Sequence, residues 1–485
     1  MTFLDTARWD GKIFVNGWTE GEGGTREVLE PATGSMLGTV GLASAGDVGR
    51  AAAVAAKAQP AWAAMRPEER AAVLRRAGQL WEEHAEEINR WIVREGGGIQ
   101  AKAALETHTA ANECYDAAAL PAHPAGEVLT SNEDRWSFAR RRPCGVVSVI
   151  APFNFPLILS IRSVAPALAL GNAVLLKPDP RTAVCGGVTL LRVFEEAGLP
   201  AGVLALLPGG AETGAAVVEA PEVRVVSFTG STAAGRTVGE SAGRLLKRAH
   251  LELGGNNALI VLPGADLAKA ASAGAFGSFM HQGQICMATG RHFVHASLYE
   301  EYVHALAEKA GNLPVGDPAG GQVALGPIID EKQLKHIHTL VHDAVRAGAR
   351  LAAGGTHHGL FYRPTVLADL ELDNPAFAQE IFGPVAPVMK FSTLDEVVEM
   401  VNGNDYGLSV GILGDVGAAM TIADRVHSGK IHINEQTVSD ESNAPFGGVG
   451  ASGTGARFGG ASANIDAFTD IQWLTMRPEI ADYPF

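Results

Sequence analysis

The stretch GVVSVIAPFNFPLILSIRSVAPALALGNAVLLK occupies residues 145–177 and decides the fold class. It contains a β-branched run over 145–151, a helical pattern over 157–170 and a short apolar run over 173–177. A strand, a helix and a second strand in this order are typical of a βαβ unit, in which the two strands lie parallel in one sheet.

The alternation of strands and helices continues downstream in two series. The first series is expected to comprise helices near 182–197 and 212–219, strands 203–208 and 223–228, and a helix from Ser231. The second is expected to comprise strand 257–262, a helix near 265–282, strand 291–296 and further elements as far as strand 430–434. We therefore predict an α/β fold with two doubly wound, Rossmann-like lobes joined near residues 252–256.

Other segments fit neither series. Residues 67–98 have the apolar spacing of one long packing helix, and Asn16-Gly17 within 12–20 is typical of a two-residue hairpin turn. Residues 125–143 and the tail from about 466 are expected to form strands that pair outside the lobes.

Composition excludes several classes of protein. The 485 residues are 47% hydrophobic and 19% charged, which is a globular and not a disordered balance. The net charge of −15 repels phosphate backbones and anionic lipid, so neither nucleic acid nor a membrane is an expected partner. Four cysteines are too few for a disulfide framework, and the most apolar stretch, 164–176, is interrupted by proline and glycine. With no basic and apolar leader pattern at the N-terminus, we expect a cytoplasmic protein.

Three residues are candidates for chemistry. Cys286 stands alone in HQGQICMATGR (281–291), where it is either a buried structural thiol or a nucleophile that needs a neighbouring charge or dipole. Glu252 is a carboxylate at the end of an apolar strand, where a surface or ion-paired role competes with a catalytic one. Asn154 follows the strand 145–151 between two prolines, and there it serves either a turn or a ligand.

Two glycine-rich segments are candidates for binding a phosphate, and only the first has the sequence context that such a site needs. FTGSTAAG (228–235) follows a strand and opens a helix, which presents backbone N–H groups to a phosphate. The GxGxxG match at 448–453 has no preceding strand, so we interpret it as a chance match and not as a dinucleotide-binding motif. His336, His338 and His342 lack an acidic partner, and we predict a solvated helix face and no metal site.

Seven motifs in order resemble the aldehyde dehydrogenase superfamily over nearly the whole chain. They are PFNFP (152–156), LLKPD (175–179), FTGS (228–231), LELGG (251–255), GQIC (283–286), EIFGP (380–384) and PFGGVGASG (445–453). The 34 residues that separate Glu252 from Cys286 also match the family spacing.

The resemblance implies catalytic roles. Cys286 would be the nucleophile, Asn154 and the Cys286 N–H would hold the oxyanion, and Glu252 would activate water to hydrolyse a thioester. A CoA-acylating enzyme is disfavoured because such relatives generally lack this glutamate. A cofactor-free thiol hydrolase and an inactive structural or binding homologue remain the rivals of other classes.

The resemblance also implies a dinucleotide site. Its expected residues are Lys177, Gly209, Gly230, Ser231, Gly235, Glu380, Phe382 and Phe153. Pro180 stands where the family commonly has a glutamate that binds the ribose 2′-hydroxyl, with Asp179 and Arg181 beside it. We expect NAD as the better cofactor, with NADP kept open. Asn256 follows ELGG at a position where lysine is frequent in the family, and the sequence offers no functional explanation for this difference.

Within the superfamily, residues 152–184 and 446–460 resemble benzaldehyde and vanillin dehydrogenases. An aromatic aldehyde is therefore the expected substrate, with an aliphatic aldehyde or a semialdehyde as the alternative. Its expected pocket comprises Phe155, Ile158, Arg162, Ile285, Met287 and Phe446, and Arg162 either pairs with an acid such as Asp440 or binds a polar group of the substrate.

The resemblance divides the chain into three parts. Residues 1–124 and 144–253 are the expected dinucleotide-binding domain, 254–465 the catalytic domain, and 125–143 with 466–485 an oligomerisation element. A homodimer or homotetramer is expected.

Overall fold

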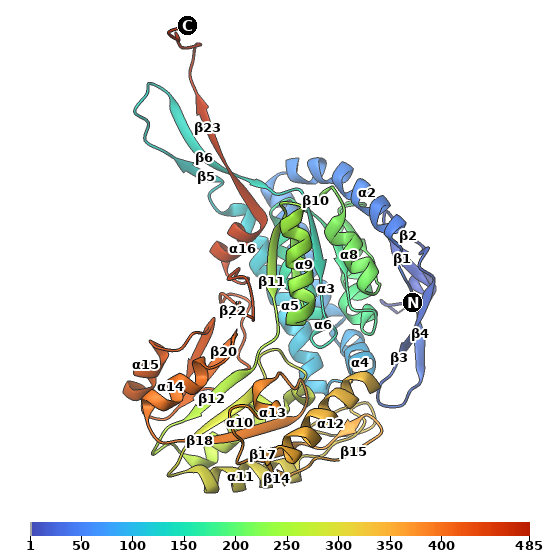
Figure 1. Cartoon of the computed structure of the whole chain (residues 1–485). Coiled ribbons are helices and arrows are strands. Elements are labelled where there is room, and N and C mark those ends of the chain that lie inside the picture. The colour runs from blue at the N-terminus through green and yellow to red at the C-terminus, as the bar shows by residue number, and fades with distance from the viewer. Residues whose placement is uncertain (1) are drawn as a thin grey trace.

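Two large sheets form two lobes, one above the other in Figure 1. The computed structural model describes residues 2–485, so residue 1 of the predicted segment 1–124 lies outside the described residues. The α/β fold class predicted from the sequence is confirmed, because each lobe holds a mainly parallel sheet covered by helices on both faces.

The first lobe contains a seven-stranded sheet in the order β11-β10-β7-β8-β9-β1-β2, in which only β1 runs antiparallel to the other strands. Its strands are β1 (Lys12–Phe14), β2 (Trp18–Glu20), β7 (Val146–Ile150), β8 (Ala173–Lys177), β9 (Leu204–Leu206), β10 (Val223–Thr229) and β11 (Arg248–Glu252). β7 and β8 are buried along their whole length, which explains why they read as unbroken apolar runs.

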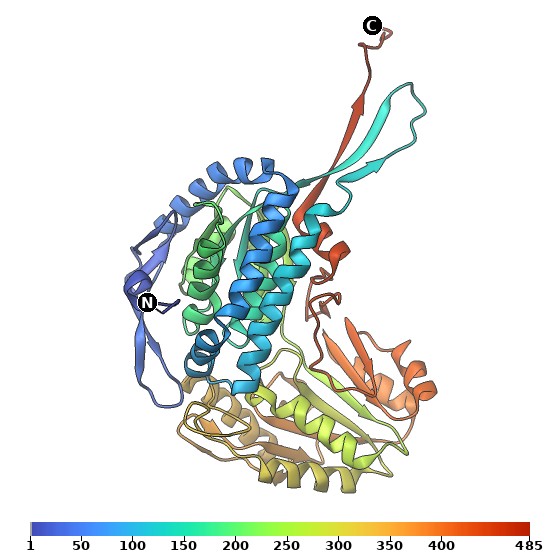
Figure 2. The same ribbon diagram turned by 180° about the vertical axis from the view of Figure 1, so that it is seen from behind.

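Helices cover both faces of this sheet. They are α1 (Thr6–Trp9), α2 (Ala45–Ala64), α3 (Pro67–Glu83), α4 (Ala85–Gly96), α5 (Gln100–Ala119), α6 (Pro156–Ala169), α7 (Thr189–Glu196), α8 (Ala211–Glu219) and α9 (Thr232–Arg244), with a 3₁₀ turn at Leu120–Ala122 and a π-turn at Val184–Val188. α8 and α9 lie on the face seen in Figure 1, and α3 and α5 lie on the face seen in Figure 2. The hairpin β3 (Thr25–Leu29) and β4 (Met36–Gly41) lies at the N-terminal edge.

The second lobe contains the sheet β14-β17-β18-β13-β12-β20-β21, parallel except for β14. Its strands are β12 (Asn257–Val261), β13 (Thr289–His295), β14 (Arg350–Ala353), β17 (Thr365–Ala368), β18 (Val385–Phe391), β20 (Ser409–Leu413) and β21 (Lys430–Ile433). One apolar core packs under α10 (Leu267–Phe279) and α11 (Tyr299–Asn312). The other packs under α12 (Glu331–Arg346), α13 (Pro375–Ala378), α14 (Leu394–Asn402) and α15 (Val416–Ala423).

Short elements complete the chain. They are the 3₁₀ turn Met280–Gly283, the strand pairs β15 (His357–His358) with β16 (Phe361–Tyr362) and β19 (Tyr406–Gly407) with β22 (Val449–Gly450), and α16 (Ala461–Phe468). Among residues 2–485, no helix is both long enough and apolar enough to span a bilayer.

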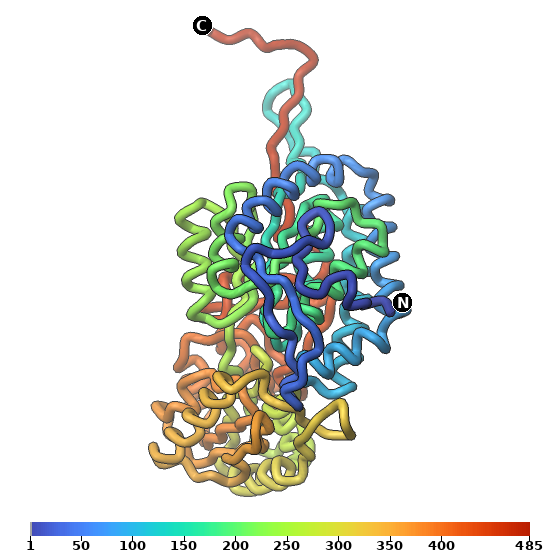
Figure 3. Tube along the Cα trace, turned by 90° about the vertical axis from the view of Figure 1, so that its right-hand side faces the viewer, coloured from blue at the N-terminus to red at the C-terminus, as the bar shows by residue number. Residues whose placement is uncertain are grey.

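A three-stranded sheet projects from the first lobe, away from the second lobe (Figure 3). It pairs β5 (Gly126–Val128), β6 (Trp136–Pro143) and β23 (Thr469–Met476), and we call it the arm. The prediction that 125–143 and the tail form strands outside the lobes is therefore correct.

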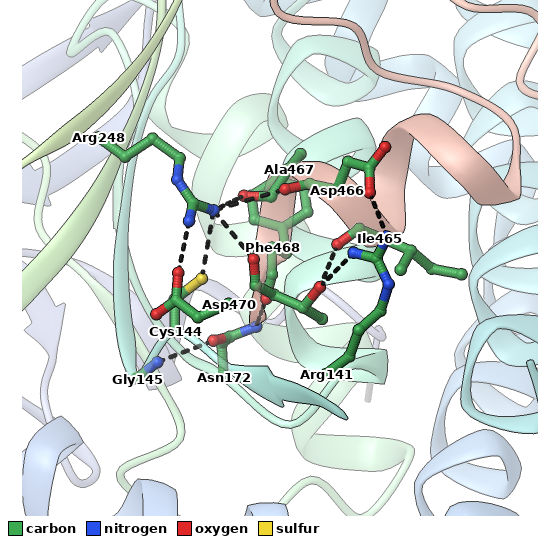
Figure 4. A network of polar contacts seen from close by, with 11 residues as sticks. Arg141, Cys144, Gly145, Asn172, Arg248, Ile465, Asp466, Ala467, Phe468 and Asp470 are labelled. Carbon is green, nitrogen blue, oxygen red and sulfur yellow. Dashed lines mark hydrogen bonds and ion pairs between the residues drawn. The ribbon is translucent and has the colours of Figure 1, made fainter. Parts of the chain in front are cut away.

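Arg248 anchors the base of the arm (Figure 4). Its guanidinium donates to the carbonyl oxygens of Ala467 and Thr469 at 3.1 and 3.2 Å and pairs with the carboxylate of Asp470. Asn172 donates from Nδ2 to the Phe468 carbonyl at 3.0 Å. These bonds satisfy backbone groups where α16 passes into β23 and fix the returning chain to the first lobe.

Two local predictions are wrong. The predicted single helix over 67–98 is two helices, because the chain breaks at His84, whose ring stacks on Phe3 with centroids 4.0 Å apart. That contact is long-range, so helical periodicity does not encode it. The predicted two-residue hairpin turn has three residues, 15–17, because Phe14 pairs with Trp18.

Candidate active site

Cys286 lies on a tight turn between α10 and β13. The turn contains His281 and Gln282 at φ 47° and 57°, and Gly283 at φ 65°. A Cβ on Gly283 would come within 2.0 Å of the Gly383 carbonyl oxygen, so only glycine fits there. The Cys286 carbonyl accepts from Asn257 Nδ2 at 2.8 Å, which fixes the backbone that carries the thiol.

Burial makes the resting thiol a weak acid. It raises the pKa of Cys286 to about 12, while the charge of Lys430 lowers it and the carboxylates of Glu380, Glu252 and Asp440 raise it. A buried thiol with a cation nearby needs that cation, or a bound partner, to react as a thiolate.

Asn154 lies directly before α6 and beside the thiol. Its side chain is buried, and Nδ2 donates to the Gln284 carbonyl at 2.9 Å. Both Asn154 and Cys286 line the same cavity. Because an amide group has two N–H donors, one remains for a ligand oxygen.

Glu252 is the last residue of β11, where the chain leaves the first lobe. Its Oε2 accepts from the Gly448 N–H at 3.2 Å, and its Oε1 has no hydrogen-bond partner among the described residues. Burial raises the pKa of Glu252 well above its usual range. The segment 448–453 thus contacts a carboxylate, and no helix begins directly after it, since α16 starts only at Ala461, in agreement with its interpretation as a chance match.

The cavity beside Cys286 is mainly apolar. It is lined by Leu105, Thr109, Asn154, Phe155, Ile158, Leu159, Arg162, Met280, Ile285, Cys286, Met287, Val438, Asp440 and Phe446. The structure brings all six residues of the expected pocket to this one cavity. The apolar members come from both lobes and pack as one cluster, so the cavity depends on how the lobes meet.

Arg162 pairs with Asp440, the first of its two expected roles, and it also lines the cavity. It donates from Nη2 to Asp440 Oδ2 at 2.6 Å, and Nε lies 3.7 Å from Glu113 Oε1. Burial acts to lower the pKa of Arg162, but the two carboxylates hold it above its usual range. The guanidinium also lies over the ring of Phe446, 4.6 Å from its centroid.

Lys430, the first residue of β21, was missed by the sequence analysis. Its Nζ donates to the Ser439 carbonyl at 2.7 Å and contacts Met287 Sδ at 2.6 Å. It lies 4.6 Å from the centroid of the Phe446 ring, so two cations contact that ring. Its only sign in the sequence is its position as a charged residue at the start of an apolar strand.

The expected dinucleotide residues of the first lobe lie mainly at the carboxyl ends of its strands. Lys177 ends β8, and burial lowers the pKa of its amine. Ser231 caps α9, where its hydroxyl accepts from the Ala234 N–H at 3.3 Å, and Gly230 precedes it. Gly209 follows β9 before α8, whereas Gly235 lies in α9 and is packed against Leu253, which a Cβ would meet at 2.1 Å.

Three expected residues close this region from the two lobes. Glu380 Oε1 accepts from the Gly255 N–H at 3.0 Å, and burial raises the pKa of Glu380 to about 7. Phe382 has a φ of 53° and meets Phe153 edge to face, with centroids 5.9 Å apart. An amine and a helix N-terminus at the strand ends of the first lobe, with a carboxylate from the second lobe bonded to Gly255, fit the ribose and pyrophosphate of a dinucleotide.

Arg181 is held by two carboxylates. It pairs with Asp179 at 2.8 Å and, across the lobes, with Asp330 at 2.7 Å, and it lies 4.2 Å from the Phe153 centroid. Burial opposes ionisation of Asp179, but the bonds and charge of Arg181 keep its pKa below its usual range. Two negative charges therefore surround one positive charge beside Lys177.

The last two expectations concern Asn256 and a possible metal site. Asn256 is buried and donates from Nδ2 to the Phe377 carbonyl at 2.8 Å, a structural contact that does not explain the absence of lysine. Within residues 2–485, no cluster of histidine, cysteine or acidic side chains has the arrangement to hold a metal ion.

The comparisons with known proteins agree with this fold and site. The model of the aldehyde dehydrogenase family matches residues 18–474, and the chain belongs to that family. It is 65% identical to the vanillin dehydrogenase of Amycolatopsis sp. over 100% of both chains, and 48% identical to the benzaldehyde dehydrogenase [NAD(+)] of Pseudomonas putida over 98% of both. A crystal structure of salicylaldehyde dehydrogenase from Pseudomonas putida G7, complexed with salicylaldehyde, superposes with a TM-score of 0.94 at 34% identity, over 98% of this chain and 99% of that one. The family resemblance in the sequence is confirmed.

Proposed function

We propose that this enzyme oxidises an aromatic aldehyde, of the benzaldehyde or vanillin type, to its carboxylic acid with a nicotinamide dinucleotide. One observation carries the proposal: the thiol of Cys286 and the amide of Asn154 share a cavity whose other walls are mostly apolar and aromatic. A flat ring gains affinity from such walls, and the named activities of the two similar relatives support the same substrate class.

The proposed chemistry begins at Cys286. The thiol first releases its proton to solvent, and the thiolate sulfur then attacks the aldehyde carbon. The resulting oxyanion accepts hydrogen bonds from the Asn154 amide and the Cys286 N–H. The dinucleotide, when bound, accepts the hydride that the thiohemiacetal carbon releases. This leaves a thioester on Cys286.

Glu252 completes the proposed cycle. As a carboxylate it takes a proton from water, which attacks the thioester and frees the thiol and the acid product. Because burial holds the pKa of this carboxyl high, the group is a stronger base than an exposed glutamate once it is ionised.

We propose that the dinucleotide lies along the strand ends of the first lobe. Lys177 and the N-terminus of α9 would hold its ribose and phosphates, with Glu380 and Phe382 at the nicotinamide end. The Asp179–Arg181–Asp330 arrangement favours NAD over NADP, because Arg181 is already paired with two carboxylates and is not free to meet a 2′-phosphate. Residues 1–124 with 144–253 are then the dinucleotide-binding domain and 254–465 the catalytic domain.

We propose further that the arm, with the tail to residue 485, joins copies of this chain into a homodimer or homotetramer. Its strands expose Trp136, Ile471 and Trp473, each about three-fifths or more accessible, and exposed aromatic groups are typical of interfaces. Four free cysteines support a cytoplasmic location.

Purified protein with benzaldehyde and NAD, followed by the absorbance of the reduced cofactor, tests the function. We expect turnover with aryl aldehydes, and a higher kcat/KM for them than for alkyl aldehydes or semialdehydes. A reversed ranking would support the aliphatic alternative, and no turnover with either dinucleotide would contradict the proposal. Cys286→Ala should abolish turnover and leave dinucleotide binding near normal, measured by fluorescence titration.

A further inference from the structure

The side chain of Lys430 has unusual surroundings for a cation. Its ammonium contacts a carbonyl, a thioether and the face of the Phe446 ring, and it has no carboxylate within 4 Å among the described residues. The nearest acceptors are uncharged, so the positive charge is not neutralised by contact.

Lys430 lies behind the cavity wall. Met287 and Phe446 line the cavity and Lys430 does not, although it contacts both. A substrate in the cavity therefore meets the side chains in front of Lys430. Met287 also follows Cys286 directly in the chain. The ammonium therefore contacts the residue next to the one that carries the thiol.

We propose that Lys430 is a positioning residue whose positive charge, held behind Met287 and Phe446, stabilises the thiolate of Cys286. This inference rests on the proposed role of Cys286 as the reacting thiol. It adds a residue that touches neither aldehyde nor dinucleotide and acts only through the charge that it brings to the sulfur.

Burial and the neighbouring charged groups set the pKa of Lys430. Burial lowers the pKa of Lys430 to about 8, the charges of Asp440, Cys286 and Glu252 raise it, and that of Arg162 lowers it. On its own strand, His432 also faces this charge, since Lys430 lowers the pKa of His432. The ammonium is thus present at neutral pH and is lost as the pH rises through about 8.

This loss has a distinct consequence for the sulfur. Below about pH 8 the thiolate fraction rises tenfold per pH unit, as for any thiol below its pKa. Above about pH 8 Lys430 loses its proton, and the neutral amine no longer stabilises the thiolate. The thiolate fraction of Cys286 therefore rises less steeply with pH. An arginine at 430 keeps its charge, and the rise should then continue.

Alkylation of the free enzyme by iodoacetamide tests the inference. The rate is read by mass spectrometry on the tryptic fragment 270–291, which contains Cys286 and none of the other three cysteines. At pH 7 we expect Lys430→Met to be alkylated about tenfold more slowly than the parent, corresponding to a one-unit rise in the thiol pKa, and Lys430→Arg to be within about twofold. The exposed Lys57→Met, which leaves the tryptic fragment 270–291 intact, is the matched control and should leave the rate unchanged.

The pH profile separates charge from packing. We expect the rate for the parent to flatten above about pH 8 and the rate for Lys430→Arg to keep rising. Identical profiles for these two proteins, or a parent-like rate for Lys430→Met, would overturn the inference. If Lys430→Met does not fold, the comparison of the parent with Lys430→Arg decides alone. Because the assay contains neither aldehyde nor dinucleotide, an expected alkylation result without aldehyde oxidation would contradict the proposed function and leave this inference standing.

Discussion

Arg162 donates to the carboxylate of Asp440 across 2.6 Å at the edge of the cavity that contains Cys286. Arg162 comes from α6 in the first lobe, and Asp440 from the chain that returns from the second lobe after β21. The guanidinium is almost fully buried, and its Nε and Nη1 have no hydrogen-bond partner among the described residues. This pair therefore joins two distant segments at the cavity and depends on both for its charge balance.

Asp440→Asn should destabilise the protein by about 2 kcal/mol, because a buried guanidinium loses a charged acceptor and keeps only Glu113 nearby. Urea unfolding measures the change. Glu86→Gln, which removes an exposed partner of Arg90, is the control and should cost less than about 0.5 kcal/mol. In an Arg162→Met background, Asp440→Asn should cost much less, and an equal cost in both backgrounds would contradict the coupling.

Asn154→Ala should lower kcat by about 10²–10³ if the amide donates to the oxyanion. The physical reason is that Asn154 lines the cavity with Cys286 and has a second Nδ2 N–H to donate, while the first already binds the Gln284 carbonyl. Steady-state kinetics with benzaldehyde measures the change, and a loss below threefold would exclude this role. Circular dichroism of the variant checks that loss of the bond to Gln284 has not altered the fold.

Glu252→Gln should slow deacylation more than hydride transfer. Glutamine keeps an oxygen that can accept from the Gly448 N–H, but it cannot take a proton from water. Rapid mixing should therefore show a burst of reduced cofactor in the first turnover, followed by a slow steady state. Full steady-state activity, or loss of the burst, would contradict the assignment.

The pH dependence of deacylation should follow the same carboxyl. Because burial raises the pKa of Glu252 well above its usual range, the group keeps its proton to a higher pH than an exposed glutamate does. The steady-state rate of the parent should rise as the pH increases through this raised pKa, and Glu252→Gln should lack that rise. A rate that is constant from pH 5 to pH 9 in both proteins would contradict the role of Glu252 as base.

Elements whose signals are local were predicted well. The bounds of β8 are those predicted for 173–177, and the helix expected from Ser231 begins at Thr232 with Ser231 as its N-cap, because apolar runs and capping residues act over a few positions. The break at His84 was missed because no proline or glycine marks it, and the contact of His84 with Phe3 joins residues about eighty positions apart in the chain.

The same distinction applies to the site. Motifs predict Cys286, Asn154 and Glu252 as site residues, because each lies at or shortly after the end of an element that the sequence marks. Lys430 was not located, because its contact with Met287 joins residues 143 positions apart and the lysine carries no motif. The choice left open for Arg162 required the position of Asp440, 278 residues away, which only the folded chain supplies.

Asp179→Asn should shift cofactor use toward NADP. The substitution removes one of the two negative charges around Arg181 and leaves its guanidinium better able to meet a 2′-phosphate beside Lys177. We expect the ratio of kcat/KM for NADP to that for NAD to rise about tenfold, which corresponds to about 1.4 kcal/mol of differential binding. Glu331→Gln is the matched control, because it removes an exposed negative charge next to Asp330 that does not pair with Arg181 within the described residues, and it should leave the ratio unchanged. An unchanged ratio in Asp179→Asn, with both proteins folded and active, would show that the Asp179–Arg181 pair does not set the choice of dinucleotide.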